Sequence, residues 1–134
     1  MRTSSFHWEI LDGRFTHFCD PRTGDNLLPP DQLAPVLTVR VRGADHLPSR
    51  MRWRQPSQLL ELHYGSAGVT ACVALQVHAT HLTMELTELT PREGVELVIW
   101  GPYPTVLAES VGETVGVAQG RSFAMGIQAL NPRT

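Results

Sequence analysis

Short runs in which apolar and polar residues alternate, separated by glycine, proline, asparagine or aspartate, extend along most of this sequence. A period of two places successive side chains on opposite faces of an extended strand. In the run 36–42, for example, Val39 and Val41 face one way, and Arg40 and Arg42 face the other. Turn signals at intervals of roughly 8 to 12 residues are typical of a sandwich or barrel. The sequence therefore predicts an all-β fold, an antiparallel β-sandwich.

The clearest local signal is Asp12-Gly13, which separates the runs Phe6 to Leu11 and Arg14 to Phe18 and predicts a tight hairpin. The best helix candidate, Thr105 to Val111, is short and ends at Gly112, so we expect no long helix. Two segments rich in turn residues, 20–35 and 43–56, are expected to be loops. The remaining expected strands cover residues 36–42, 60–64, 69–77, 82–87, 95–100, 114–118 and 123–130.

The chain of 134 residues has the length of one domain, and no repeat or linker divides it. We therefore expect a single β-sandwich domain over residues 1–134. The residues expected on its inner faces share the period of two; they are Val39, Val41, Leu60, Leu62, Val73, Leu75, Leu82, Met84, Leu97 and Ile99.

Composition excludes several classes of function. All eleven basic residues are arginine, which excludes Schiff-base chemistry and a Walker-A phosphate site. A net charge of −2 argues against an electrostatic nucleic-acid binder. The longest apolar run, Ala71 to Leu75, is far too short to span a membrane, and the N-terminus shows no signal peptide. Cys19 and Cys72 lack a CxxC spacing, so we expect reduced thiols and a cytoplasmic protein.

Histidine and carboxylate pairs are the first candidates for chemistry, but none has a convincing spacing. His78 and His81 are three residues apart, and with Glu85 they would bind zinc only if a tight turn brings them together. Glu85 and Glu88 should face opposite sides of a strand, and Glu109 and Glu113 flank a turn. We therefore expect no metal, no other cofactor and no catalytic carboxylate dyad.

A small basic cluster surrounds one aromatic residue. Arg50, Arg52 and Arg54 with Trp53 combine charge and a flat ring, as single-stranded nucleic-acid sites do. The negative net charge favours the simpler interpretation, a loop whose arginines pair with acids.

The segment Trp100 to Thr105, WGPYPT, is the most unusual local sequence. Its glycine and two prolines fix the backbone, while Trp100 and Tyr103 offer flat faces on which a sugar ring can stack. These two residues are the candidate ligand-binding residues. The alternative is that Trp100 closes the core and Tyr103 covers it.

The C-terminal third carries a resemblance, mainly over residues 95–131. The runs VELVIWGPYPT (95–105), VGETVGV (111–117) and FAMGIQALN (123–131) resemble the N-terminal galactose-mutarotase-like β-sandwich region of bacterial glycoside-hydrolase-like proteins. In that family this region precedes a catalytic barrel. The resemblance implies an N-terminal piece of a larger protein, about half of a complete supersandwich in length. No catalytic residue carries over to this chain, because the family's acid and nucleophile lie on the barrel.

Two functions follow as expectations. The first is a non-catalytic, carbohydrate-associated β-sandwich module that is accessory to a glycoside-hydrolase-like enzyme. The second is a small sugar epimerase or mutarotase-like enzyme that uses His63, His78 and Glu85 as acid and base. In either case the strand Phe123 to Leu130, which has no charge and no proline, is a poorly protected sheet edge. We expect a homo-oligomer, or contact with a partner domain, through this strand.

Overall fold

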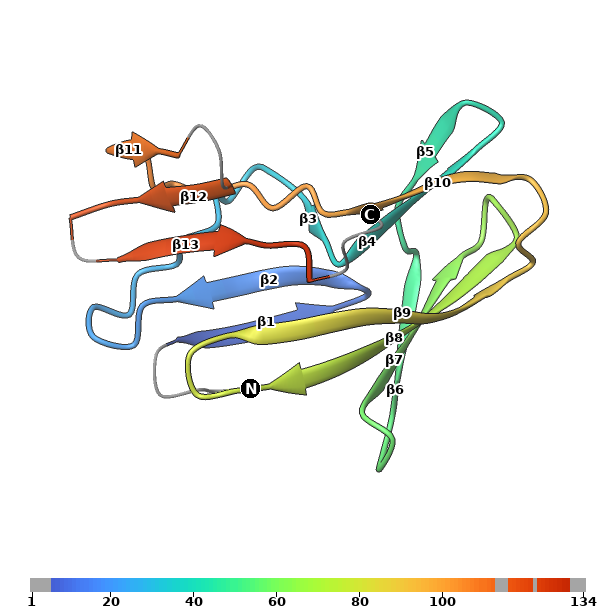
Figure 1. The fold of residues 1–134 in the computed structure, drawn as a ribbon, viewed down its shortest axis with the longest axis horizontal. Coiled ribbons are helices and arrows are strands. Elements are labelled where there is room, and N and C mark those ends of the chain that lie inside the picture. Colours follow the sequence, from blue (N-terminus) through green and yellow to red (C-terminus); the bar gives the residue numbers. More distant parts are fainter. Residues whose placement is uncertain (1–5, 113–115, 122, 131–134) are drawn as a thin grey trace. The chain divides into compact units, whose positions relative to one another are not determined.

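The computed structural model describes residues 6–112, 116–121 and 123–130, and within them it contains thirteen β-strands and no helix (Figure 1). The expected all-β class is confirmed, with several open antiparallel sheets. The chain divides into two compact units, unit 1 over Met1–Pro104 and unit 2 over Thr105–Thr134. The single domain over 1–134 stays a prediction. Within the described part of the chain there is no helix that could cross a membrane.

Unit 1 begins with the expected hairpin, formed by β1 (His7–Leu11) and β2 (Arg14–Cys19), with the short β3 (Ala34–Pro35) beside β2. Asp12 and Gly13 have φ angles of 49° and 77°, the positive values that a two-residue primed turn requires. A Cβ added at Gly13 would lie 2.7 Å from the Pro48 ring. Glycine is therefore needed here for its conformation and for the space that Pro48 occupies.

A second sheet has the order β10 (Val95–Trp100), β4 (Leu37–Val41), β5 (Ala44–His46). A bulge between Val95 and Leu97 shifts the register, so that Leu97 pairs with Arg40 and Val98 pairs with Val39. Paired residues share a face. The bulge thus turns Leu97 away from the core side of β4, and Leu97 is 46% exposed. The expectation that Leu97 faces inward is wrong for this reason.

The third sheet of unit 1 is a meander in the order β6 (Arg50–Arg54), β7 (Leu59–Tyr64), β8 (Val69–Val77), β9 (Leu82–Thr90). The expected loop over 43–56 is wrong, since it contains both β5 and β6. Strand β6 alternates strictly, with exposed arginines on one face and the half-buried Met51 and Trp53 on the other. The charges of β6 favoured a loop in the prediction, although its residues also alternate with a period of two.

The core of unit 1 follows the predicted alternation over most of its length. Of the expected inner residues, five are buried: Val39, Leu60, Leu62, Val73 and Leu75. Four are half-buried: Val41, Leu82, Met84 and Ile99. The structure adds the aromatic residues Phe6, Trp8, Phe15 and Tyr64 to the buried core.

Two tyrosines bind consecutive carbonyl groups just before and within β4. Tyr64 donates its hydroxyl to the Leu37 carbonyl at 2.8 Å, and Tyr103 donates to the Val36 carbonyl at 2.6 Å. The Tyr103 ring also meets Phe15 edge-on, with ring centroids 5.7 Å apart. Burial raises the pKa of both phenols, because it disfavours the charged form. Both side chains therefore hold the start of β4 in place as neutral donors.

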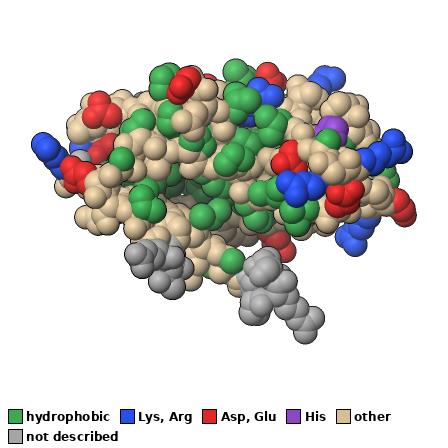
Figure 2. All heavy atoms as spheres, turned by 90° about the horizontal axis from the view of Figure 1, so that it is seen from above, with side chains coloured by type: hydrophobic (Ala, Val, Ile, Leu, Met, Phe, Trp, Pro, Cys, Tyr) green, Lys and Arg blue, Asp and Glu red, His purple; other side chains and the backbone are tan. Residues whose placement is uncertain are grey.

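Unit 2 contains one sheet in the order β11 (Ser110–Val111), β12 (Gly116–Gln119), β13 (Ala124–Ile127). The side chain of Val117 lies over Gly126, where an added Cβ would approach it to 2.7 Å. Exposed apolar side chains occur in both units, and in Figure 2 hydrophobic side chains reach the surface in many places. In unit 2 the most exposed ones are Val106, Val111, Ile127 and Leu130.

Candidate functional site

A group of chemistry-bearing side chains of unit 1 lies on one face of the β6–β9 sheet, here called the polar face. Cross-strand pairs fix its membership, because paired residues project to the same side. Three rows of paired residues run across the four strands: Arg50–His63–Thr70–Thr90, Arg52–Glu61–Cys72–Glu88 and Arg54–Leu59–Ala74–Glu85. The opposite face carries the apolar core residues of the same strands.

Glu61 lies at the centre of the polar face and is only 7% exposed. Its Oε1 lies 3.0 Å from His63 Nε2, and its Oε2 forms an ion pair with the Arg54 guanidinium. His63 Nδ1 lies 3.3 Å from the Thr70 hydroxyl oxygen. A carboxylate removed from water needs such partners, since an unpaired buried charge is strongly disfavoured. Arg54 and His63 supply the partners that the buried Glu61 carboxyl group needs.

Cys72, the cross-strand partner of Glu61, is a free thiol that is also buried. Burial raises the pKa of this thiol, and the negative charge of Glu88 raises it further. A thiol that stays protonated is a poor nucleophile. Cys72 thus belongs to the packing of the face rather than to covalent chemistry.

The arginines of β6 are the exposed cations of the polar face. Within the described residues, Arg54 pairs with Glu61, whereas Arg50 and Arg52 form no ion pair. The expectation of a loop here is therefore wrong, because residues 50–54 form a strand. Of its three arginines, Arg54 pairs with an acid as expected. Trp53 lies on the other face of β6, paired with the buried Leu60, so it does not stack beside the arginines.

A second bulge decides the position of the acids on β9. The register shifts between Cys72 and Val73, so that Glu88 pairs with Cys72 and Glu85 pairs with Ala74. Cys72 and Ala74 share a face, and the two glutamates therefore do so as well. The expectation that Glu85 and Glu88 face opposite sides is wrong because of this extra residue.

The histidines and glutamate proposed as acid and base do not converge. His63 and Glu85 share the polar face, but their rows are four residues apart, about 13 Å along the strands. His78 lies in the β8–β9 connection, where its ring stacks on His81 with centroids 4.3 Å apart. Nearly parallel rings direct their nitrogen lone pairs side by side rather than toward one point. Among the described residues no three His, Cys, Asp or Glu side chains form a metal-binding group.

The remaining expected site residues have structural surroundings. Trp100 is half-buried and pairs with the buried Leu37. Tyr103 is half-buried; its hydroxyl binds the Val36 carbonyl, and its ring contacts Phe15 in a T-shaped arrangement. Their role in ligand binding stays a prediction. Glu109 forms an ion pair with Arg121 at 3.1 Å, and Glu113 lies outside the described residues.

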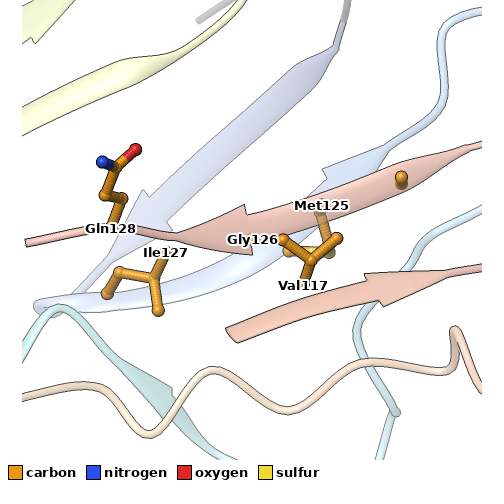
Figure 3. Close-up of a pocket in the computed structure, with 6 residues that line it drawn as sticks. Val117, Met125, Gly126, Ile127 and Gln128 are labelled. Carbon is orange, nitrogen blue, oxygen red and sulfur yellow. The ribbon is translucent and has the colours of Figure 1, made fainter. Parts of the chain in front are cut away.

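In unit 2 a shallow hollow of about 300 Å³ lies along β12 and β13. Figure 3 shows Val117 facing Gly126 on the neighbouring strand, with Ile127 and Gln128 farther along. None of the residues that line it has an ionisable side chain. The hollow thus offers apolar contact but no acid, base or metal ligand.

Comparison of the chain with protein-family models, with curated proteins and with solved structures finds no match. The resemblance to galactose-mutarotase-like regions stays a prediction. The sequence singled out the three arginines, His63 and Glu85, but it missed Glu61. The available signal was a charged residue between Leu60 and Leu62, two positions before His63.

Proposed function

We propose that this chain is a non-catalytic β-sandwich module that binds an acidic carbohydrate on the polar face of the β6–β9 sheet. The observation that supports it is the row of arginines on β6, in which Arg50 and Arg52 have no acid partner within the described residues. A guanidinium binds a carboxylate through two parallel hydrogen bonds. Alternate positions on a strand are about 6.6 Å apart, so the row offers successive anion contacts along one edge.

The mixed charge of the face favours a sugar acid over a nucleic acid. Glu85 and Glu88 lie on the same face as the arginines and would repel a phosphate backbone, whereas they can accept hydrogen bonds from sugar hydroxyls. The face also lacks an aromatic ring on which a base could stack, since Trp53 points to the other side.

The separation of His63 from Glu85 supports binding without catalysis. Two further parts of the proposal come from the resemblance. They are an accessory role beside a glycoside-hydrolase-like enzyme and a galactose-mutarotase-like form of the sandwich. Cys19 and Cys72 are both unpaired, which fits the reducing cytoplasm that we propose as its location.

Affinity electrophoresis tests the binding. We expect gels containing polygalacturonate to retard the chain and gels containing a neutral galactan not to. Arg50→Gln should weaken the binding roughly tenfold, because it removes one charged donor pair. Arg92→Gln, in the exposed turn after β9, is the matched control and should not. Equal retardation in both gels, or tighter binding to single-stranded DNA, contradicts the proposal.

One observation favours a second candidate, the sugar epimerase or mutarotase-like enzyme. Glu61 lies 3.0 Å from His63 and can orient its imidazole as a general base. Polarimetry on freshly dissolved aldoses tests it: an acceleration that His63→Asn abolishes would support the enzyme, and no acceleration would exclude mutarotation.

A further inference from the structure

The β6–β9 sheet has two open edges within the described residues. Strand β6 pairs only with β7, and β9 pairs only with β8. An edge strand presents unpaired N–H and C=O groups that can add a strand from another chain. The question is which strand fits each edge.

Charge makes the two edges complementary. On the polar face, β6 carries Arg50, Arg52 and Arg54, and β9 carries Glu85 and Glu88. Two β6 edges would place arginines against arginines, and two β9 edges would place glutamates against glutamates, and both arrangements are unfavourable. The charges therefore oppose pairing between identical edges and favour β6 beside β9.

Strand direction and register agree with the charges. All three pairings in the meander are antiparallel, so β6 and β9 run in opposite directions. A second copy placed with its β6 beside β9 continues the antiparallel order. If the rows stay in line, Glu85 meets Arg54 of the next copy, and Glu88 meets Arg52.

The apolar face continues in the same register. Its rows are Trp53–Leu60–Val73–Leu86 and Met51–Leu62–Ala71–Leu89. The outer members of both rows are half-buried. A second copy would place Trp53 beside Leu86 and Met51 beside Leu89, at the spacing of 4.5–5.5 Å between paired Cβ atoms. Both faces of the two edges are thus complementary in one alignment.

We propose that copies of this chain associate head to tail, with the β9 edge of one copy paired to the β6 edge of the next. Such a contact joins two different surfaces, so it can add further copies without closing a two-fold dimer. The inference goes beyond the proposed function, because it needs no carbohydrate. Arg50 is left out of the new ion pairs, since its row ends at Thr90.

Sedimentation of the full chain, without polysaccharide, tests the association. We expect the average mass to rise about twofold or more with concentration and to fall as salt screens the ion pairs. Two variants each break one edge: Glu85→Arg with Glu88→Arg on β9, and Arg52→Glu on β6. Each alone should stay monomeric. An equimolar mixture should regain a larger mass, because the native β9 edge of the β6 variant can pair with the native β6 edge of the β9 variant.

The control carries Glu93→Arg, in the turn after β9, and should assemble as the native chain does. Circular dichroism shows whether each variant folds. Where a variant does not fold, Glu88→Gln takes its place and should lower the average mass by a smaller amount. A native chain that stays monomeric, or a mixture that does not recover, overturns the proposal. Arg50→Gln should weaken polygalacturonate binding and keep the association, so failure of one proposal is distinguishable from failure of the other.

Discussion

The sheets β6–β9 in unit 1 and β11–β13 in unit 2 differ in what they bury and in what their edges carry. The inner strands of the first contain side chains that are fully buried, such as Leu62 and Val73, and its edges carry charges. In the second, the described side chains are exposed or half-buried, and the edge strand β13 carries no charge. Face burial stabilises a sheet, whereas edge charge selects its partners, and the two sheets differ in both properties.

The largest expected difference between the two sheets is the response to loss of an apolar side chain. Leu75 on β8 is 1% exposed, and Leu75→Ala should lower the free energy of unfolding by about 2 to 5 kcal/mol. Ile127 on β13 is 46% exposed, and Ile127→Ala should cost less than about 1 kcal/mol. Urea denaturation measures both. Equal losses would show that unit 2 contributes a core comparable to that of unit 1.

Substitutions at Tyr103 distinguish a role in supporting the fold from a role as a sugar-binding surface. The hydroxyl bonds the Val36 carbonyl and the ring contacts Phe15, so Tyr103→Ala should lower the melting temperature of the chain. Tyr103→Phe keeps the ring and should cost about 1 kcal/mol. An unchanged melting temperature for Tyr103→Ala, with lost binding to sugar, would instead support the ligand role.

Alternation, turn chemistry and composition were enough to predict the class of fold, the Asp12-Gly13 hairpin and the burial of residues such as Leu60 and Leu75. The two bulges were not predicted. One extra residue moves every later side chain of the strand to the opposite face, and local residue propensities do not indicate where it lies. The consequences were Leu97 placed on the wrong side and Glu88 placed away from Glu85. The arginines of β6 were noticed, but their partner Glu61 was not, because strand pairing brings the two together across a turn.

Alkaline pH should loosen unit 1 through Tyr64. Burial raises the pKa of its phenol above the unfolded value near 10, so the folded state favours the protonated form. The stability it contributes is complete below about pH 10 and is lost as the pH rises further. Tyr64→Phe should cost about 1 kcal/mol at neutral pH and reduce the loss of stability between about pH 10 and 11. Urea denaturation at both pH values measures the change, and an unaltered slope would contradict it.

The smallest expected effect concerns the uncharged edge of unit 2. Strand β13 pairs only with β12 within the described residues, and the sequence predicts a homo-oligomer or a partner domain through it. A strand of four residues, Ala124–Ile127, offers few backbone hydrogen bonds, so any contact here should be weaker than one through the nine residues of β9. Ile127→Glu places a charge on the edge and should shift the chain toward smaller assemblies in sedimentation, but less than the β9 reversals do. Gln119→Glu adds the same charge to the inner strand β12 and is the matched control. If both variants sediment as the native chain does, the β13 edge takes no part in assembly.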